Sequence, residues 1–482
     1  MPPVPPAFLP VSALSVELEA YVAVTASIHA GFADARTTFE CVLPPLRDAG
    51  FFVLAGLEPL LDALERFKLK NDELTWLETL GAVDAQAKRR LVDMRFSCDV
   101  DAALEGTVVF PGEPVLTVEG PFWQAQLVSA LIRGGLTSST LTATRAARCY
   151  LAADGAEVIE GSATTAHRLG GNPLGARAAY IGGASATTCA LAARRYRLPV
   201  RASLPRQFAL GDASERAMFE SWLRASQDKA ILRLESSDAE SGIRGLIEAV
   251  KSRASQASWH QGDIAVEIAG GDHAEVAQLL IDAFDKARLG EPVLVASGDL
   301  DEHAIANLRL RETPISAYIV PSFDVDDGTW PARYDLTAIE SNGQWSPRMR
   351  RGATVADSGD PGRKVIVRYA DREGQWLADV AHATNERVQS ARDVEFVDRA
   401  TGFPAQLSAA KGAPLLTNVM RAGKRVSAPE AARTLRERTV RSLVALPERY
   451  RRLRAPALYP VGTTPALAAI KQEILERAAF GG

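Results

Sequence analysis

Two acidic clusters contain residue types and spacings that could do chemistry. SGDLDE (297–302) and DVDDG (324–328) offer carboxylate oxygens, which are the ligands that Ca²⁺ and Mg²⁺ prefer. DVDDG lacks the rest of an EF-hand loop, so we interpret it as a solvated turn. SGDLDE follows an apolar run and precedes a predicted helix, so Ser297 or Asp299 could cap that helix. Free N–H groups at the same helix start could instead bind an anionic ligand, and the spacing leaves both interpretations open.

The other short motifs favour structural interpretations. The glycine-rich stretch GGNPLG (170–175) lacks the Walker lysine and the GxGxxG spacing, which favours a loop over a phosphate cradle. The segment 421–454 is rich in Arg and Lys, but its one aromatic residue is Tyr450, so a solvated helix face is favoured over a nucleic-acid interface. The six histidines show no HExxH spacing and the four cysteines form no CxxC pair, which argues against a zinc site.

Length and composition indicate a protein of two or three globular domains. The 482 residues are 47% apolar and 24% charged, and a domain takes roughly 150 residues. The net charge of −4 is too small to indicate a polyanion as partner of the whole chain. The N-terminal MPPVPPAFLP has no basic n-region, and no apolar run reaches the roughly 20 residues of a membrane span. We therefore predict a cytoplasmic protein with reduced thiols and no membrane contact.

The elements that would position the acidic clusters change character along the chain. Helix formers dominate residues 15–31 and 122–153, whereas β-branched residues and a Pro-Gly turn predict β structure over 104–120. From about 156 to 325, short apolar runs alternate with helical stretches, which is typical of βα units and a parallel sheet. We predict six strands there, enough for an irregular, incomplete α/β barrel. They are EVIEGS, PVRASL, AILRLES, DIAVEIAG, PVLVASG and SAYIVPS.

Several blocks in collinear order resemble the nicotinate phosphoribosyltransferase family, the type II phosphoribosyltransferases of NAD salvage. The ordered set is specific and spans nearly the whole chain. The blocks are TFE (38–40), FFVLAGLE (51–58), EGTVVFPGEPVLTVEGPFWQAQLVSALI (105–132), LTATRAAR (141–148), GARAAYIGG (175–183), VASGDLDE (295–302), PGRKVIVR (361–368), Leu446-Pro447 and YPV (459–461).

The resemblance implies an α/β N-terminal domain together with an irregular α/β barrel. We expect the first domain to comprise residues 1–127 with about 345–425, the barrel 128–344, and a helical tail 426–482. Residues 341–364, rich in Gly, Pro, Ser and Arg, are expected to form a linker or an exposed loop. Because active sites of the family form at a dimer interface, the resemblance also implies a homodimer or a heterodimer with another family member.

The implied reaction joins nicotinate to phosphoribosyl pyrophosphate and releases pyrophosphate. Such a site needs Arg or Lys and backbone N–H groups on the phosphates, and carboxylates to hold Mg²⁺ and balance the cationic sugar. In the family, ATP also phosphorylates an active-site histidine. Mg²⁺ and ATP are therefore expected from the resemblance alone, and phosphoribosyl pyrophosphate and nicotinate are the implied ligands.

The departures from the family pattern are concentrated in the motifs that carry this chemistry. Where the family has R-R-A-H, this chain has Thr164 and Thr165 before His167, so two guanidinium groups are missing. Where the family motif G-T-M-A-H-S has the phosphorylatable histidine, this chain has Arg206. Arginine stays protonated, so it cannot act as base or phosphoryl acceptor, although it could still bind a phosphate.

Three further motifs differ. The family's V-D-T-Y-D becomes residues 234–238, and G-V-G-T becomes residues 319–322, where Pro321 removes an N–H donor. R-L-D-S-G-D becomes EIAGGD (267–272), which loses a carboxylate to Ala269. The remaining candidates for binding substrate or phosphate, besides Thr164, Thr165 and Arg206, are His167, Thr187, Thr188, Asp272, Ser297, Gly298 and Asp299.

These departures predict nicotinate phosphoribosyltransferase activity that is impaired or lost. One alternative is a non-catalytic structural or regulatory partner of an active paralogue, that is, a pseudoenzyme. The other is a phosphoribosyltransferase that uses a different acceptor.

Overall fold

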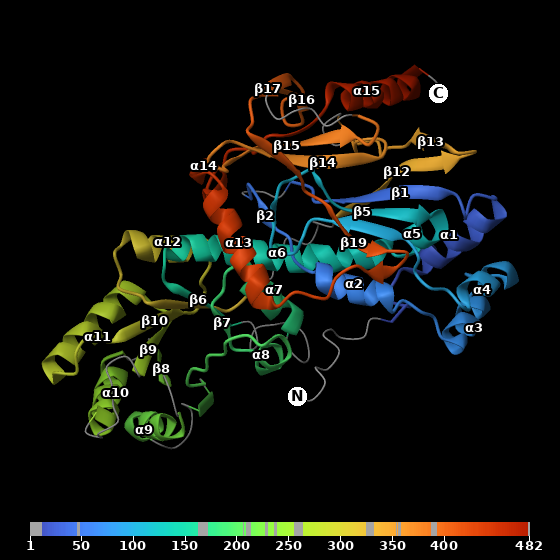
Figure 1. Cartoon of the computed structure of the whole chain (residues 1–482). Helices are drawn as coiled ribbons and strands as arrows, with labels where there is room; N and C mark the ends of the chain where they lie inside the picture. Colours follow the sequence, from blue (N-terminus) through green and yellow to red (C-terminus); the bar gives the residue numbers. More distant parts are fainter. Residues whose placement is uncertain are drawn as a thin grey trace. The chain divides into compact units, whose positions relative to one another are not determined.

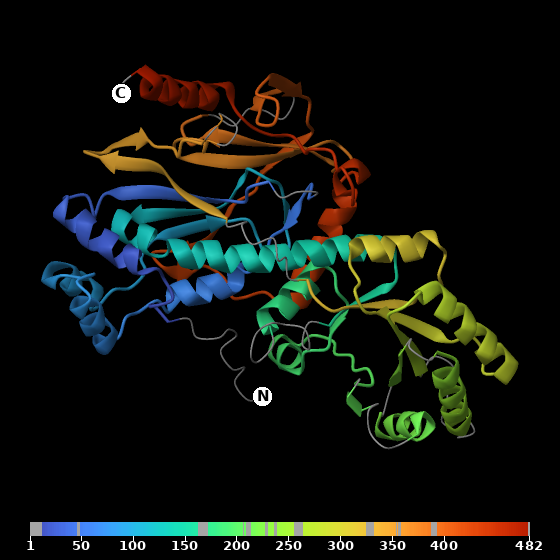
Figure 2. The same cartoon turned by 180° about the vertical axis from the view of Figure 1, so that it is seen from behind.

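The chain is described by a computed structural model, which Figure 1 shows from one side and Figure 2 from behind. It describes residues 12–45, 49–161, 172–205, 207–208, 214–226, 230–235, 239–254, 264–323, 332–352, 354, 358–386 and 393–480. The chain divides into two compact units. Unit 1 comprises Met1–Leu141 and Val325–Gly482, and unit 2 comprises Thr142–Asp324.

Unit 1 is mainly antiparallel β structure. Its strands are β1 (Arg36–Val42), β2 (Phe52–Val53), β3 (Asp99–Ala102), β4 (Val108–Val109), β5 (Pro114–Pro121), β12 (Arg333–Ser341), β13 (Gln344–Pro347), β14 (Lys364–Ala370), β15 (Trp376–Ala383), β16 (Val394–Asp398), β17 (Pro404–Leu407), β18 (Lys411–Pro414), β19 (Thr417–Arg421), β20 (Lys424–Arg425) and β21 (Val461–Thr463). One sheet has the order β13-β12-β1-β5-β3-β19-β20, a second has the order β17-β16-β21-β15-β14-β18, and β2 pairs with β4. In the second sheet β15 and β21 run parallel.

The helices of unit 1 are α1 (Leu18–His29), α2 (Leu57–Glu65), α3 (Asn71–Thr79), α4 (Ala85–Leu91), α5 (Phe122–Leu127), α13 (Ala432–Ala445), α14 (Glu448–Arg451) and α15 (Pro465–Phe480). The long helix α6 (Ser129–Ala153) contains the boundary between the two units.

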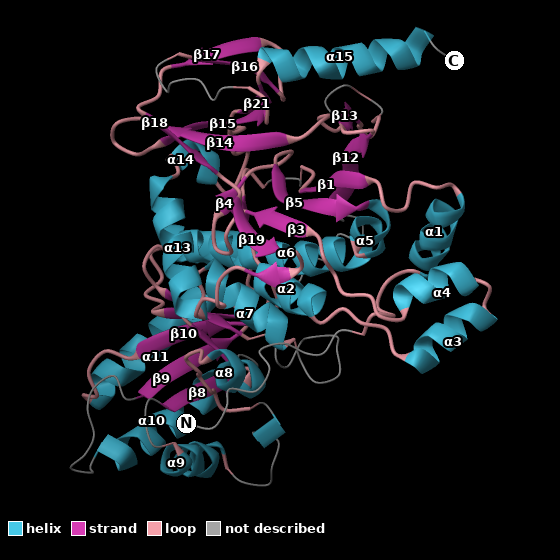
Figure 3. Cartoon of the chain, turned by 45° about the vertical axis from the view of Figure 1, so that its right-hand side comes forward, coloured by secondary structure: helices cyan, strands magenta, loops and turns pink. Residues whose placement is uncertain are grey.

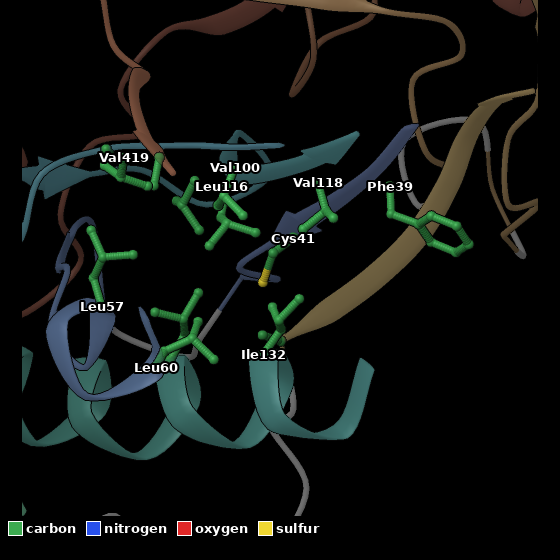
Figure 4. Close-up of a cluster of buried hydrophobic side chains, with 14 of the residues drawn as sticks. Phe39, Cys41, Leu57, Leu60, Val100, Leu116, Val118, Ile132 and Val419 are labelled. Carbon is green, nitrogen blue, oxygen red and sulfur yellow. The ribbon is translucent and has the colours of Figure 1, made fainter. Parts of the chain in front are cut away.

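The core of unit 1 lies between its first sheet and two helices (Figure 4). Alternation along β1 points Phe39 and Cys41 into this core, because successive side chains of a strand face opposite sides. Leu57 and Leu60, three residues apart on α2, cover the same side from below. All four side chains are buried, so this cluster fixes the register of β1 against its neighbours.

Unit 2 alternates strands and helices. Its strands are β6 (Glu157–Glu160), β7 (Ala186–Thr187), β8 (Ala230–Glu235), β9 (Ile264–Ala269), β10 (Val293–Ser297) and β11 (Ala317–Val320). Its helices are α7 (Pro173–Gly182), α8 (Ala190–Tyr196), α9 (Glu215–Ala225), α10 (Ala239–Ala254), α11 (His273–Ala287) and α12 (Glu302–Leu310). The strands form one parallel sheet in the order β7-β6-β11-β10-β9-β8, and Figure 3 shows β8, β9 and β10 side by side.

The segment 199–204 joins the two edges of this sheet. Thr187 of β7 forms an isolated parallel bridge with Val200, and Ser203 forms another with Ile231 of β8. The Leu204 N–H also donates to the Ile231 carbonyl over 3.1 Å. The sheet therefore closes into an irregular α/β barrel, which confirms the fold class predicted from the sequence.

The prediction that PVRASL (199–204) is a regular strand is wrong, since it makes these isolated bridges only. Pro199 and Pro205 remove a backbone donor at each end, which prevents a continuous ladder. The other five predicted barrel strands are confirmed as β6, β8, β9, β10 and β11.

Outside the barrel, two sequence predictions need correction. Residues 341–364 are not wholly a linker, because β12 reaches Ser341 and β13 follows at once. Asn342 and Gly343, both with positive φ, make the tight turn, and Asn-Gly is a strong hairpin signal that the sequence did contain. The C-terminal segment predicted as helical also contributes β21 to the second sheet. None of the described helices combines the length and apolar composition needed to cross a membrane.

Candidate functional site

The inside of the barrel begins with an apolar layer. Side chains from five strands form it, one from each: Ile159, Ala186, Ile231, Val295 and Ala317. All are buried. Because residues i and i+2 of a strand share a face, the next inward-facing layer lies two residues further along each strand. Parallel strands place that layer nearer the carboxyl ends, where active sites of α/β barrels lie.

This next layer is polar and charged. Arg233 of β8 and Ser297 of β10 lie two residues beyond members of the apolar layer, and Glu267 of β9 is the register partner of Arg233 and of Val295. Glu267 Oε1 accepts from Arg233 Nη1 over 2.9 Å and from Ser297 Oγ over 2.5 Å. Arg233 Nε donates to Glu235 Oε1 over 2.8 Å, so the guanidinium lies between two carboxylates. We call Arg233, Glu235, Glu267 and Ser297 the polar layer.

A cavity of about 570 Å³ lies between helix α12 and the loops that follow β9 and β10. Its lining includes Asp272 and Asp299, and it also includes His273 and Arg311. His273 Nε2 donates to the carbonyl of Ser297 over 2.8 Å, which ties the start of α11 to the end of β10. The structure therefore brings Asp272, Ser297, Gly298 and Asp299 to one edge of the barrel.

Asp272 already has several partners. Its carboxylate caps α11 by accepting from the N–H groups of Ala274 and Glu275, and it pairs with Arg311 Nη2 at 3.1 Å. The hydrogen bond from Arg311, followed by the backbone donors, lowers the pKa of Asp272 below its ordinary value. Asp272 is therefore an ionised helix cap held by an arginine.

The expectation that Ser297 or Asp299 caps the following helix is wrong. Asp301 caps α12, accepting from the N–H groups of His303 at 2.9 Å and Ala304 at 2.7 Å. The reason is that α12 starts at Glu302, two residues later than it would start if Asp299 were its N-cap. Asp299 is exposed at the cavity, and Ser297 is buried against Glu267.

Gly298 meets a backbone requirement between these groups. Its φ is +110°, a conformation that residues with a Cβ rarely adopt. A Cβ there would lie 3.4 Å from the backbone of Gly270, in the loop after β9. The two loops thus approach each other closely at a pair of glycines.

The two threonines at the end of β7 have different surroundings. Thr187 is buried, its hydroxyl pairs with Glu160, and it accepts from the Cys189 N–H over 2.9 Å. That is a structural arrangement. The Thr188 hydroxyl oxygen is buried and has no hydrogen-bond partner among the described residues, so it can still bind a ligand.

Four candidate residues lie outside the described part of the chain: Thr164, Thr165, His167 and Arg206. Their roles remain predictions. Sequence reasoning in turn missed Arg233, Glu267, His273 and Arg311. A signal for the first two was present, because AILRLE and IAVEIA each carry one charged residue at an interior, alternating position of an apolar strand.

Mg²⁺ and ATP are the cofactors that the resemblance implies. Among the residues that the structure describes, no group of three His, Cys, Asp or Glu could hold a metal ion. Mg²⁺ in phosphate-binding enzymes is often held by one or two carboxylates and the phosphates themselves. Asp272 and Asp299 would be those carboxylates, and Mg²⁺ would neutralise phosphate charge there. An arginine at 206 does not fit the role of phosphoryl acceptor from ATP.

A closed parallel barrel with polar groups at its carboxyl edge is the architecture of a type II phosphoribosyltransferase. The structure resembles that of human nicotinic acid phosphoribosyltransferase, with a TM-score of 0.79 and 22% identity, over 95% of this chain and 99% of the human one. It also resembles the nicotinate-nucleotide pyrophosphorylase of Pyrococcus furiosus, with a TM-score of 0.66 and 18% identity, over 90% and 95% of the two chains.

Sequence comparison then identifies the family. The models for the nicotinate phosphoribosyltransferase N-terminal and C-terminal domains match residues 21–132 and 363–471, both within unit 1. Nicotinate phosphoribosyltransferase pncB2 of Mycobacterium tuberculosis is 31% identical over 329 residues, which are 68% of each chain. The Bacillus subtilis nicotinate phosphoribosyltransferase is 27% identical over 366 residues, 74% of each chain. This chain belongs to the nicotinate phosphoribosyltransferase family.

Proposed function

We propose that this chain acts in NAD salvage as a family member whose nicotinate phosphoribosyltransferase activity is impaired or lost. In the family reaction the ring nitrogen of nicotinate forms a bond to the anomeric carbon of phosphoribosyl pyrophosphate. The bond from that carbon to the pyrophosphate oxygen breaks, and pyrophosphate leaves with the electron pair. Both substrates are anions, so the reaction needs cations at the site.

The charge balance of the site carries this proposal. The charged side chains of the polar layer and of the cavity are two arginines, Arg233 and Arg311, and four carboxylates, among the residues that the structure describes. Each arginine is paired with at least one of those carboxylates. Such a surface repels a polyanion unless other groups compensate. Thr164 and Thr165, at the family's arginine positions, cannot supply that compensation.

The direct test is an assay of purified protein with nicotinate, phosphoribosyl pyrophosphate and Mg²⁺, with and without ATP. Chromatography would measure nicotinate mononucleotide, and a coupled assay would measure pyrophosphate. The M. tuberculosis relative under the same conditions is the control. We expect no product at an ordinary enzyme rate. A turnover near roughly 1 s⁻¹, within the usual enzymatic range, would overturn the proposal.

A restored variant sharpens the assay. Thr164→Arg and Thr165→Arg combined with Arg206→His would return the family's residue types to the three positions. We expect the triple variant to gain nicotinate-dependent pyrophosphate release over the wild type. If it stays as inactive as the wild type while folding normally, these three positions are not the cause of the lost activity.

A transferase with a different acceptor is favoured as the second candidate by Glu267, which stands where the family motif has arginine. Isothermal titration with phosphoribosyl pyrophosphate and Mg²⁺ separates it from a non-catalytic partner. Binding supports a transferase or a sensor, whereas no binding supports a purely structural partner. A structural partner would also co-purify with an active family member from its native cell.

A further inference from the structure

The second oxygen of Glu267 is one of the buried polar atoms of unit 2 that have no hydrogen-bond partner among the described residues. The side chain is 1% exposed. Both of its donors, Arg233 and Ser297, bind the same oxygen, Oε1. Oε2 has no hydrogen-bond partner among the described residues. A buried carboxylate oxygen without a donor is unfavourable, so native proteins rarely keep one without a use for it.

The oxygen itself is buried, but the polar layer around it borders solvent on one side. The apolar layer closes the barrel toward the amino ends of the strands. On the other side, the Arg233 and Glu235 side chains are 27% and 32% exposed, so solvent reaches the polar layer from the carboxyl edge. A small molecule entering there would meet Glu267 as the floor, with Ser297 and Thr188 as further polar groups near the strand ends.

We propose that Glu267 determines the acceptor of this chain by accepting a hydrogen bond at Oε2 from an N–H group of a nitrogen heterocycle. The acceptor would be an uncharged or cationic ring base that carries an amide or amino group. This inference rests on the proposed loss of nicotinate activity and names the class of acceptor that replaces nicotinate.

Charge explains why nicotinate itself would bind poorly beside the Glu267 carboxylate. Its carboxylate would bring a second negative charge against a buried one and would offer no donor to Oε2. The corresponding carboxamide has the same ring and nearly the same shape, but it is neutral and supplies two N–H donors. A site with an unpaired buried acceptor discriminates strongly between two such ligands, because the wrong one leaves that acceptor unpaired.

Glu267 needs no proton transfer in this scheme. The ring nitrogen would still form the bond to the anomeric carbon, and pyrophosphate would still leave with the electron pair. The amide would remain hydrogen-bonded to Oε2 throughout. Glu267 is therefore a specificity-determining residue, and its loss should change which base binds more than whether phosphoribosyl pyrophosphate binds.

The test uses nicotinate and nicotinamide as a matched pair of probes. Isothermal titration of the full chain, in the presence of Mg²⁺ and phosphoribosyl pyrophosphate, would give both dissociation constants. We expect the wild type to bind nicotinamide at least about tenfold more tightly than nicotinate. Glu267→Gln, whose amide can donate to a carboxylate, should lose or invert that preference.

Glu157→Gln is the control. Glu157 lies on the same face of the sheet, at the amino end of β6 on the other side of the apolar layer, so its change should leave the preference unaltered. Circular dichroism would confirm that both variants fold, and the wild-type preference stands as a test without either variant.

Equal or tighter binding of nicotinate by the wild type, without turnover, would overturn the role of Glu267 and leave the proposed function intact. Binding of neither probe would also overturn it and make Glu267 structural. Rapid turnover of nicotinate would overturn the proposed function itself.

Discussion

Two buried carboxylates, one in each unit, have different sets of partners. In unit 1, Lys364 Nζ lies 2.7 Å from each oxygen of Glu40, and both side chains are almost wholly buried. In unit 2, Glu267 is equally buried, but its two donors bind one oxygen and leave the other open. A pair that satisfies itself can only stabilise or orient the fold. A carboxylate with one open oxygen can also bind something else.

A second pair in unit 1 follows the self-contained pattern. Arg368 Nε donates to Asp379 Oδ1 at 2.9 Å, Nη2 donates to Oδ2 at 2.5 Å, and Nη1 donates to the Val108 carbonyl at 2.8 Å. The guanidinium also lies 4.1 Å from the centroid of the Trp376 ring. Arg368 and Val108 belong to PGRKVIVR and EGTVVFPGEP. Those two blocks resemble the family and lie in unit 1, whereas the described residues of the blocks that differ lie in unit 2.

The largest effect is expected from Lys364→Ala. It removes the partner of Glu40, whose pKa burial raises even with Lys364 beside it. We expect a loss of about 3–5 kcal/mol in the free energy of unfolding, because the buried carboxyl must stay unpaired or take up a proton. Urea denaturation measures this loss.

Two comparisons test whether breaking the buried Lys364–Glu40 pair causes the loss of stability. Lys88→Ala breaks the exposed Lys88–Glu78 pair and should cost less than about 1 kcal/mol. Lys364→Met combined with Glu40→Leu removes both charges and should recover most of the stability. If Lys364→Ala cost no more than Lys88→Ala, the contrast between self-contained and open charges would lose its basis.

A smaller, pH-dependent effect is expected from Glu113→Gln. Burial, and then the charge of Asp379, raises the pKa of Glu113 well above its ordinary value. The folded protein therefore holds a proton at Glu113 over a pH range in which the unfolded chain has lost it. The stabilisation is complete below the unfolded pKa of 4.5 and is lost as pH rises through the folded pKa.

Glutamine resembles the protonated form at every pH. The variant should therefore gain stability relative to the wild type as pH rises above 4.5, by at most about 1.4 kcal/mol per pH unit. Paired urea denaturations from pH 5 to 9 measure the difference. A difference that does not change with pH would mean that Glu113 ionises alike in both states. Glu113 also has one oxygen without a hydrogen-bond partner among the described residues and, like Glu267, it lies beside an arginine, but a second buried carboxylate, Asp379, raises its pKa.

The sequence allowed much of the barrel to be predicted, for a physical reason. Strands such as AILRLE and PVLVA are short apolar runs, and their alternation with amphipathic helices indicates a parallel sheet without knowledge of any contact. The segment 199–204 was misjudged because its apolar pattern resembles a strand, while pairing depends on donors that its flanking prolines remove. Whether an apolar segment pairs as a strand depends on tertiary contacts that the sequence pattern alone does not reveal.

The site was harder to predict because spacing along the chain does not reveal which face of the barrel a residue occupies. Asp272, Ser297 and Asp299 were predicted together and do gather at one edge. Arg233 and Glu267 are 34 residues apart, and their pairing follows only from the register of β8 against β9. Arg311 becomes part of the site because the end of α12 returns to Asp272, which no local pattern indicates.

The smallest effect on stability is expected from Arg311→Ala at the cavity. Arg311 and Asp272 are each nearly half exposed, so water and salt screen their attraction. Urea denaturation at neutral pH should show only a small loss, far below that of Lys364→Ala. The pKa of Asp272 should nevertheless rise toward its ordinary value, because the hydrogen bond from Arg311 is the largest cause of its lowering. Asp272 then loses stabilisation that is present above its unfolded pKa and disappears as pH falls through its folded pKa.

Titration of the Asp272 carboxyl by NMR measures this change, and Asp84 is an internal control. The pKa of Asp84 is lowered first by the Ala87 N–H and next by His29, and Arg311 is not among its causes, so it should stay constant in the variant. A loss of stability as large as that of Lys364→Ala would show that the cavity pair is as structural as the core pair. A small loss of free energy with a raised pKa would instead show that the charges at the barrel edge can be re-paired at little cost to the fold, which is what a ligand with its own charges requires of them.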